Sequence, residues 1–353
     1  MTETHKAVTP GHTLRLSGPH RPPAVSVSGQ MGQVMLALVP AIGLHVVFFG
    51  WGILVQLSLA LVFGLALEAL MLKLRRRPIR PFISDGSVAV AAVLLALCLP
   101  PLAPWWVVAS GMVFAVVIAK HLYGGLGYNL FNPAMVGLAA VIIAFPDAMS
   151  NWLSPRGLGD PTPNLGQTLH AIATGALPAG LDWDSISRAT PLDELRAGLM
   201  ARLTISEIRE SAVFSALGGH GWGMIALAYL AGGLWLMARG VIRWQAPLAV
   251  VLTTLVIAVT AWLFSPDSAF PPSQQLFAGS LMMAAFFIVT DPVSGSSTPR
   301  GRLIFGAGVA MITLAIRQFG AYPDGVAFAV LLMNMLVPLI DRYTRPRIYG
   351  HPV

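Results

Sequence analysis

One stretch decides the fold class: residues 52–72 read GILVQLSLALVFGLALEALML, with Glu68 as their only charged side chain. About 20 consecutive apolar residues form a helix long enough to cross the hydrocarbon core of a membrane. The whole chain shares this character, because 56% of its 353 residues are hydrophobic and only 10% are charged. Soluble domains carry about 25% charged residues. The composition therefore predicts an all-α integral membrane protein.

Further apolar stretches repeat the pattern of residues 52–72. We expect about ten transmembrane helices, near residues 33–50, 52–72, 86–102, 104–120, 132–146, 221–238, 246–264, 275–290, 302–319 and 323–340. The predicted organisation is an N-terminal tail at 1–32, a first transmembrane repeat at 33–146, a long extracytoplasmic segment at 147–217, a second transmembrane repeat at 218–341 and a C-terminal tail at 342–353.

Lysine and arginine predict the orientation. If the N-terminus is cytoplasmic, sixteen of the 22 basic side chains fall in cytoplasmic segments and six fall outside. Cytoplasmic loops of membrane proteins carry this excess. We therefore expect both termini in the cytoplasm and residues 147–217 on the extracytoplasmic side. The net charge of +7 is then explained by basic residues that orient the chain in a lipid bilayer, so we expect no nucleic-acid partner.

A weak internal repeat relates the two halves. Gly86-Ser87 and Ala91-Ala92 open the third expected helix, and Gly279-Ser280 and Ala284-Ala285 recur in the same register at the eighth. Five helices separate the copies, so the copies run in opposite directions. Paired, interrupted helices in two inverted groups of five predict a site near the middle of the membrane. Chance matching in an apolar sequence is the alternative.

The segment Asp184-Ser185-Ile186-Ser187-Arg188-Ala189-Thr190 carries the first candidate site. Thr190 offers a hydroxyl that a flavin phosphate could esterify, Ser187 and Ala189 are small enough to leave it accessible, and Arg188 offers a charge for the phosphate. The alternative is structural: Thr190 as the N-cap of a helix with proline at its first position. Both interpretations can hold together.

Two further segments favour ligand binding. Residues 124–137 read GGLGYNLFNPAMVG. The backbone at Gly125 can approach a flat ligand, and Asn129 and Asn132 can both donate to and accept from a ring edge. A tight turn capped by asparagine is the alternative.

Asp291, in Thr290-Asp291-Pro292-Val293-Ser294-Gly295, is a candidate ligand for a transported cation at a helix break. The alternative is a boundary residue near Arg300 and Arg302. For Glu68, snorkelling beside Lys73 is a sufficient explanation.

Four ordered motifs carry a resemblance to a known family. They are Ser84-Asp85-Gly86, the glycine-rich stretch at 124–137, Ser187-Arg188-Ala189-Thr190, and the segment around Asp291. Over about residues 30–345 the chain resembles the D subunits of Rnf-type ion-translocating oxidoreductases and, more distantly, the B subunits of sodium-pumping NADH:quinone oxidoreductases. The family's attachment pattern has glycine where Ser185 and Arg188 stand here.

The resemblance implies FMN bound covalently to Thr190 and a non-covalent riboflavin near Asn129 and Asn132. It implies a subunit that is not catalytic alone and that passes electrons from an extracytoplasmic flavin through FMN to the second flavin, coupled to Na⁺ or H⁺ translocation. The implied partners are other membrane and peripheral subunits, including a second covalent-FMN subunit and iron–sulfur subunits, in the bacterial inner membrane. The single cysteine, Cys98, places no iron–sulfur cluster on this chain.

A passive channel or solute transporter on the same scaffold is the alternative function. It predicts a continuous polar path and no bound flavin.

Overall fold

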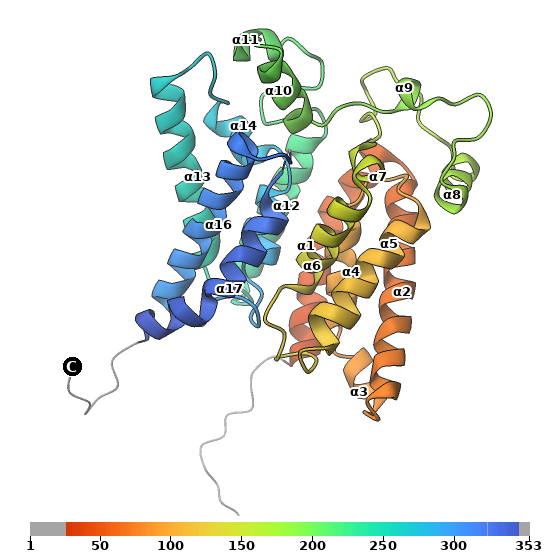
Figure 1. Ribbon diagram of the computed structural model, residues 1–353, viewed down its shortest axis with the longest axis vertical. Helices are drawn as coiled ribbons and strands as arrows, with labels where there is room; N and C mark the ends of the chain where they lie inside the picture. Colours follow the sequence, from red (N-terminus) through yellow and green to blue (C-terminus); the bar gives the residue numbers. More distant parts are fainter. Residues whose placement is uncertain (1–25, 323, 346–353) are drawn as a thin grey trace, which may run out of the picture.

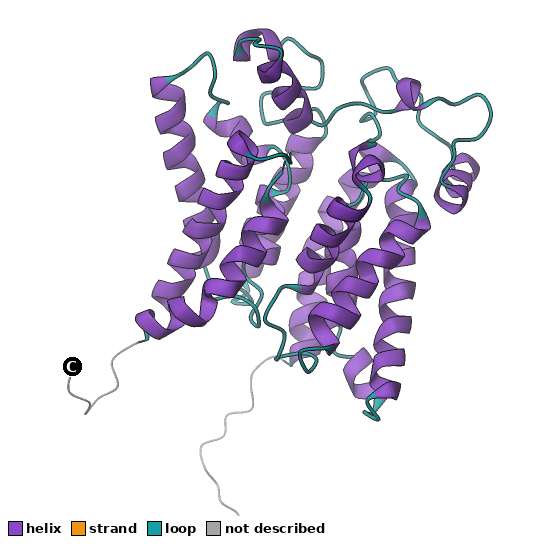
Figure 2. Cartoon of the chain, viewed as in Figure 1, coloured by secondary structure: helices purple, strands orange, loops and turns teal. Residues whose placement is uncertain are grey.

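The computed structural model describes residues 26–322 and 324–345, which form helices joined by loops and turns, with no strand among them (Figure 2). Two isolated bridges, Leu153 with Ser187 and Phe214 with Gly219, are the extended pairings within that range. Most of the predicted tails, residues 1–25 and 346–353, lies outside the described residues.

The first group of helices comes from the N-terminal half. Its main members are α1 (Val27–Phe49), α2 (Gly52–Leu74), α4 (Ser87–Ala96), α5 (Trp105–Met112) continuing into the π-helix η1 (Val113–His121), and α6 (Pro133–Ala144). Two short helices, α3 (Ile79–Ile83) and α7 (Pro146–Ser150), lie at its ends.

The second group comes from the C-terminal half. It contains α12 (Trp222–Ala238), α13 (Gln245–Phe264), α14 (Pro272–Phe277), α15 (Leu281–Met283) with the π-helix η2 (Ala284–Ile288), α16 (Pro299–Phe319) and α17 (Val326–Thr344). The eighth expected helix is broken at residues 278–280, where Gly279 adopts φ +65°. A side chain is strained at this φ, which suits glycine.

Each predicted apolar range coincides with helical structure. Within the described residues, five helices are long and apolar enough to cross a membrane: α1, α2, α13, α16 and α17. The apolar segments α4, α5–η1, α6 and α12 are shorter. The prediction of an all-helical chain with membrane-spanning helices is confirmed at this level.

The polar segment between the groups folds into four short helices, α8 (Leu165–Thr174), α9 (Trp183–Ile186), α10 (Pro191–Met200) and α11 (Ile205–Ile208). Figure 1 shows them together at one end of the molecule, with the start of α1 and the end of α17 at the other. Three apolar residues of α10 and α11 pack with Phe270 and Ala278 and so fix this segment to the second group: Leu192, Ile205 and Ile208.

Small residues let the two groups approach closely. α1 packs on α12, and α6 packs on α17. At Gly232 of α12, an added Cβ would lie 2.3 Å from the carbonyl oxygen of Ala37 in α1. Apolar surface alone does not drive helices together in lipid, so close backbone packing of this kind supplies the attraction.

We predict that Gly232→Ala lowers the thermal unfolding midpoint in detergent, because the added methyl forces α1 and α12 apart at a cost of about 1–3 kcal/mol. Circular dichroism at increasing temperature measures the midpoint. Gly43→Ala is the matched control, since a Cβ at Gly43 of α1 meets nothing within 4 Å. Equal midpoints for the two variants would contradict the close-packing argument.

Candidate functional site

A cavity of about 350 Å³ lies between the two groups of helices, and Thr190 lines it. We call it the Thr190 cavity. Its wall is largely apolar and aromatic and draws on both groups and on the polar segment. The lining includes His45, Trp152, Trp222, Tyr229 and Met283.

Thr190 is the N-cap of α10, and Pro191 holds the first helical position. The Thr190 hydroxyl donates to Asp193 Oδ2 at 2.5 Å and accepts from the Asp193 backbone N–H at 3.3 Å. Burial raises the pKa of Asp193, and the hydrogen bonds from Thr190 oppose that rise. The structural interpretation of Thr190 is therefore confirmed, and the half-buried hydroxyl still lines a cavity.

The residues before Thr190 are held against the chain near Trp152. The Ser154 N–H donates to Ile186 O at 2.9 Å, and the Arg188 N–H donates to Trp152 O at 3.0 Å. Ile186 is fully buried and anchors the segment. These contacts fix where the chain enters the cap at Thr190.

The three predicted neighbours of Thr190 differ in their roles. Arg188 binds Asp160 through Nη2 at 2.8 Å and Nε at 3.0 Å, so its guanidinium pairs within the protein. The Ser187 hydroxyl donates to Trp183 O at 2.7 Å. Ala189 is exposed and leaves the approach to Thr190 open.

Aromatic rings form one side of the Thr190 cavity. The centroids of Trp152 and Trp222 lie 4.9 Å apart at 68°, and Phe49 packs against Trp222 at 4.8 Å. Such walls favour a planar, mainly apolar ligand whose few polar atoms meet a few fixed partners.

A second cavity, of about 550 Å³, brings together three predicted residues from different segments, Asn129, Asn132 and Asp291. We call it the Asn132 cavity. Leu126 and Gly127 line it, whereas Gly125 is buried beside Arg75, with φ +100°.

Asn132 is the N-cap of α6, as the structural alternative predicted. Its side-chain oxygen accepts from the Met135 N–H at 3.2 Å, and its own N–H donates to Asn334 Oδ1 at 3.0 Å. The Asn129 amide donates to Phe131 O at 3.1 Å. Both asparagines keep further hydrogen-bonding capacity for a ligand in the cavity.

The carboxylate of Asp291 caps the loop that follows η2. It accepts from the Ser294 hydroxyl at 2.6 Å, from the Val293 N–H at 3.1 Å and from the Asn132 amide at 3.4 Å. Arg302 Nε instead donates to Ser296 O. Within the described residues, no group of three or more His, Cys, Asp or Glu side chains could hold a metal ion. A cation at Asp291 stays a prediction.

Glu68 corrects one interpretation from the sequence. It does not depend on Lys73: Oε1 lies 2.8 Å from Lys120 Nζ and Oε2 lies 3.0 Å from His121 Nε2, with all three side chains buried. Nη1 of Arg75, which can only donate, lies 3.2 Å from His121 Nδ1. Burial makes such pairing obligatory.

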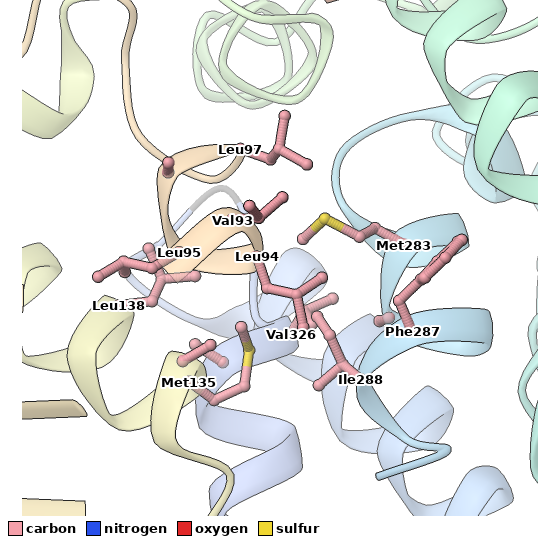
Figure 3. Close-up of a cluster of buried hydrophobic side chains, with 14 of the residues drawn as sticks. Val93, Leu94, Leu95, Leu97, Met135, Leu138, Met283, Phe287, Ile288 and Val326 are labelled. Atoms are coloured by element: carbon pink, nitrogen blue, oxygen red, sulfur yellow. The ribbon is translucent and has the colours of Figure 1, made fainter. Parts of the chain in front are cut away.

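Sequence reasoning missed the lining residues His45, Trp152, Trp222 and Tyr229. The only available signal was a histidine inside the apolar range 33–50. A cluster of buried apolar side chains joins helices of the first group to helices of the second group (Figure 3). Leu94 and Phe287 of this cluster line the Asn132 cavity, and Leu97, Leu138 and Met283 line the Thr190 cavity.

The helices and the two cavities between them define a multi-pass membrane protein with its candidate sites at the junction of two helix groups. The chain belongs to the NQR2, RnfD, RnfE family, whose sequence model matches residues 15–350. The resemblance found in the motifs is thus confirmed.

Similar proteins include one from Escherichia fergusonii that is named as the D subunit of an ion-translocating oxidoreductase complex. It is 50% identical over 326 residues, which cover 90% of this chain and 93% of the relative. A protein of the same name from Cronobacter sakazakii is 48% identical with the same coverage of each chain.

We predict that Glu68→Gln lowers the free energy of unfolding by about 3–5 kcal/mol, because it leaves the buried Lys120 ammonium without its counter-charge. Denaturant unfolding in detergent measures this change. The control is Glu210→Gln, which alters an exposed carboxylate and should stay within about 0.5 kcal/mol of the wild type. A Glu68 variant as stable as that control would show that the pair contributes little.

Proposed function

We propose that this chain is the electron-carrying subunit of an ion-translocating oxidoreductase complex, with FMN esterified to Thr190. The names of its relatives support membership of such a complex. Other membrane and peripheral subunits then supply the remaining redox centres, including a second covalent-FMN subunit and iron–sulfur subunits.

One observation carries the assignment of the cofactor: the Thr190 hydroxyl lies on the wall of an aromatic cavity beside an exposed approach at Ala189. An ester at this hydroxyl would hold the ribityl phosphate at the helix cap and leave the ring free to enter the cavity. The N-terminus of α10 favours the negative phosphate. Flavin supplies one- and two-electron transfer when bound.

The Asn132 cavity suits a second, non-covalent flavin such as riboflavin. Asn129 and Asn132 line this cavity and can both donate and accept. Electrons would pass from the Thr190 cavity to the Asn132 cavity through the apolar cluster whose members line both. Tethering keeps the first ring at high local concentration in every redox state.

The proposed topology has ten membrane helices in two inverted groups of five, in the bacterial inner membrane. Both termini are cytoplasmic, and the segment with Thr190 is periplasmic. The positive charges of the short loops support this orientation, as does the position of α8–α11 opposite the start of α1 and the end of α17 (Figure 1).

Cation movement is the proposed counterpart of electron transfer. Charge is costly in a low-dielectric slab, so an electron entering it favours a compensating Na⁺ or H⁺. Asp291 is the proposed cation partner, since its carboxylate lines the Asn132 cavity at the broken end of η2. The alternative function, a passive channel or transporter, finds less support because members of one buried apolar cluster line both cavities, whereas a channel needs a continuous polar path.

We predict that Thr190→Val abolishes flavin fluorescence of the denatured chain on a gel, because valine has no hydroxyl to esterify. Thr204→Val is the matched control: Thr204 also caps a short helix in the same segment through its hydroxyl. The control should stay fluorescent. A dark wild-type band, or fluorescence that persists in Thr190→Val, would refute the attachment.

We predict that Asp291→Asn lowers the number of cations translocated per electron at least several-fold and leaves the covalent flavin in place. Reconstituted complex in vesicles, with ion uptake and electron transfer recorded together, provides the measurement. Ser294→Ala controls for the loop, because it removes one hydrogen bond to Asp291 and keeps the carboxylate. Unchanged coupling in Asp291→Asn would remove this residue from the ion path.

A further inference from the structure

A buried polar pair, His45 of α1 and Tyr229 of α12, lies in the wall of the Thr190 cavity. His45 Nε2 lies 3.1 Å from the Tyr229 hydroxyl oxygen, and the two residues are only 2% and 5% exposed. His45 Nδ1 has no hydrogen-bond partner among the described residues. Buried polar atoms almost always have a partner, so the hydrogen-bonding capacity of this pair in the cavity wall is not exhausted by the described residues.

The surroundings of the pair are apolar rings. The His45 ring packs on Phe49 at 5.9 Å between centroids, and the Tyr229 ring meets Phe287 edge-on at the same separation. Phe287 lines the Asn132 cavity. Tyr229 thus contacts a residue of the Asn132 cavity. Asp193, Ser280 and Asp324 also line the Thr190 cavity, but they already have partners: Asp193 accepts from Thr190, and Asp324 accepts from Ser280 and pairs with Arg317.

A phenol hydrogen-bonded to an imidazole can either donate or accept toward a third group. With the ring proton on Nε2, His45 donates to Tyr229, whose own proton is then free to reach a ligand. With the proton on Nδ1, the hydroxyl donates to Nε2 and its lone pairs are free to accept. An oxidised isoalloxazine ring offers acceptors along one edge, and the reduced ring adds an N–H donor. The pair can meet both forms without a charged group.

We propose that the Tyr229 hydroxyl, oriented by His45, hydrogen-bonds the ring of the flavin attached at Thr190 and raises the affinity of that ring for electrons. The proposal rests on the proposed function. Tyr229 is assigned as a binding residue and His45 as a positioning residue. The affinity of the ring for electrons rises because reduction makes the acceptor atoms of the ring more negative. A hydrogen-bond donor held beside them therefore stabilises the reduced form more than the oxidised form.

The test is a redox titration of the purified full-length chain, in which visible absorbance reports the ratio of reduced to oxidised covalent flavin at one ambient potential. Tyr229→Phe removes one oxygen atom and should lower that ratio about three- to tenfold, as expected for one lost hydrogen bond. His45→Phe retains the ring packing and should shift the ratio in the same direction. A Thr190→Val sample subtracts the signal of any other flavin.

Tyr343→Phe provides the matched control, because Tyr343 is 79% exposed at the end of α17, and its ratio should equal that of the wild type. Tyr229→Phe with wild-type flavin content and an unchanged ratio would overturn the hydrogen bond. A dark wild-type band on the denaturing gel would overturn the proposed function instead. The two failures are therefore distinguishable.

Discussion

The constraint on which the rest of the structure depends is that polar groups inside an apolar slab must find partners within the protein. The break in the eighth helix shows how this is met. The Ser280 N–H and hydroxyl both donate to Asp324 Oδ2, at 2.8 and 2.7 Å. Arg317 donates to the carbonyl oxygens of Gln275 and Ala278, and to Asp324. The Asp324 carboxylate and the Arg317 guanidinium thus hydrogen-bond backbone groups that the helix break leaves without helical partners. The broken segment can therefore form part of the wall of the Thr190 cavity.

The same constraint explains which features the sequence predicts. Helices at the expected apolar ranges follow from composition alone, because an apolar run has no other way to satisfy its backbone. Helix N-caps can also be predicted from local sequence. Thr190 is followed by proline and acidic residues, Asn132 is followed by proline, and both residues cap helices as these patterns indicate. The break in the eighth helix is a finding of the structure, because the sequence predicted interrupted helices but placed a single helix over residues 275–290.

Contacts between residues that are far apart in the sequence cannot be predicted from such local patterns. Glu68 and Lys120 are 52 residues apart, and His45 and Tyr229 are 184 apart. Neither pair leaves a local pattern, so the sequence alone favours the nearer Lys73 as the partner of Glu68, and the tryptophans of the Thr190 cavity give no signal of their own. The partnership of Asn132 with Asp291 is likewise hidden, although each residue is a candidate by itself.

The π-helical winding of η1 has a consequence for the first group of helices. In α5, Gly111 lets α6 approach so closely that a Cβ on Gly137 would lie 2.5 Å from the Gly111 carbonyl oxygen. After the wider turns of η1, the same continuous rod presents Lys120 and His121 to Glu68 of α2. A regular α-helix keeps one angular phase along its length. The wider turns of η1 change the direction in which the following side chains leave the helix. One continuous helix can therefore pack closely on α6 through α5 and also present charged side chains to Glu68 through η1.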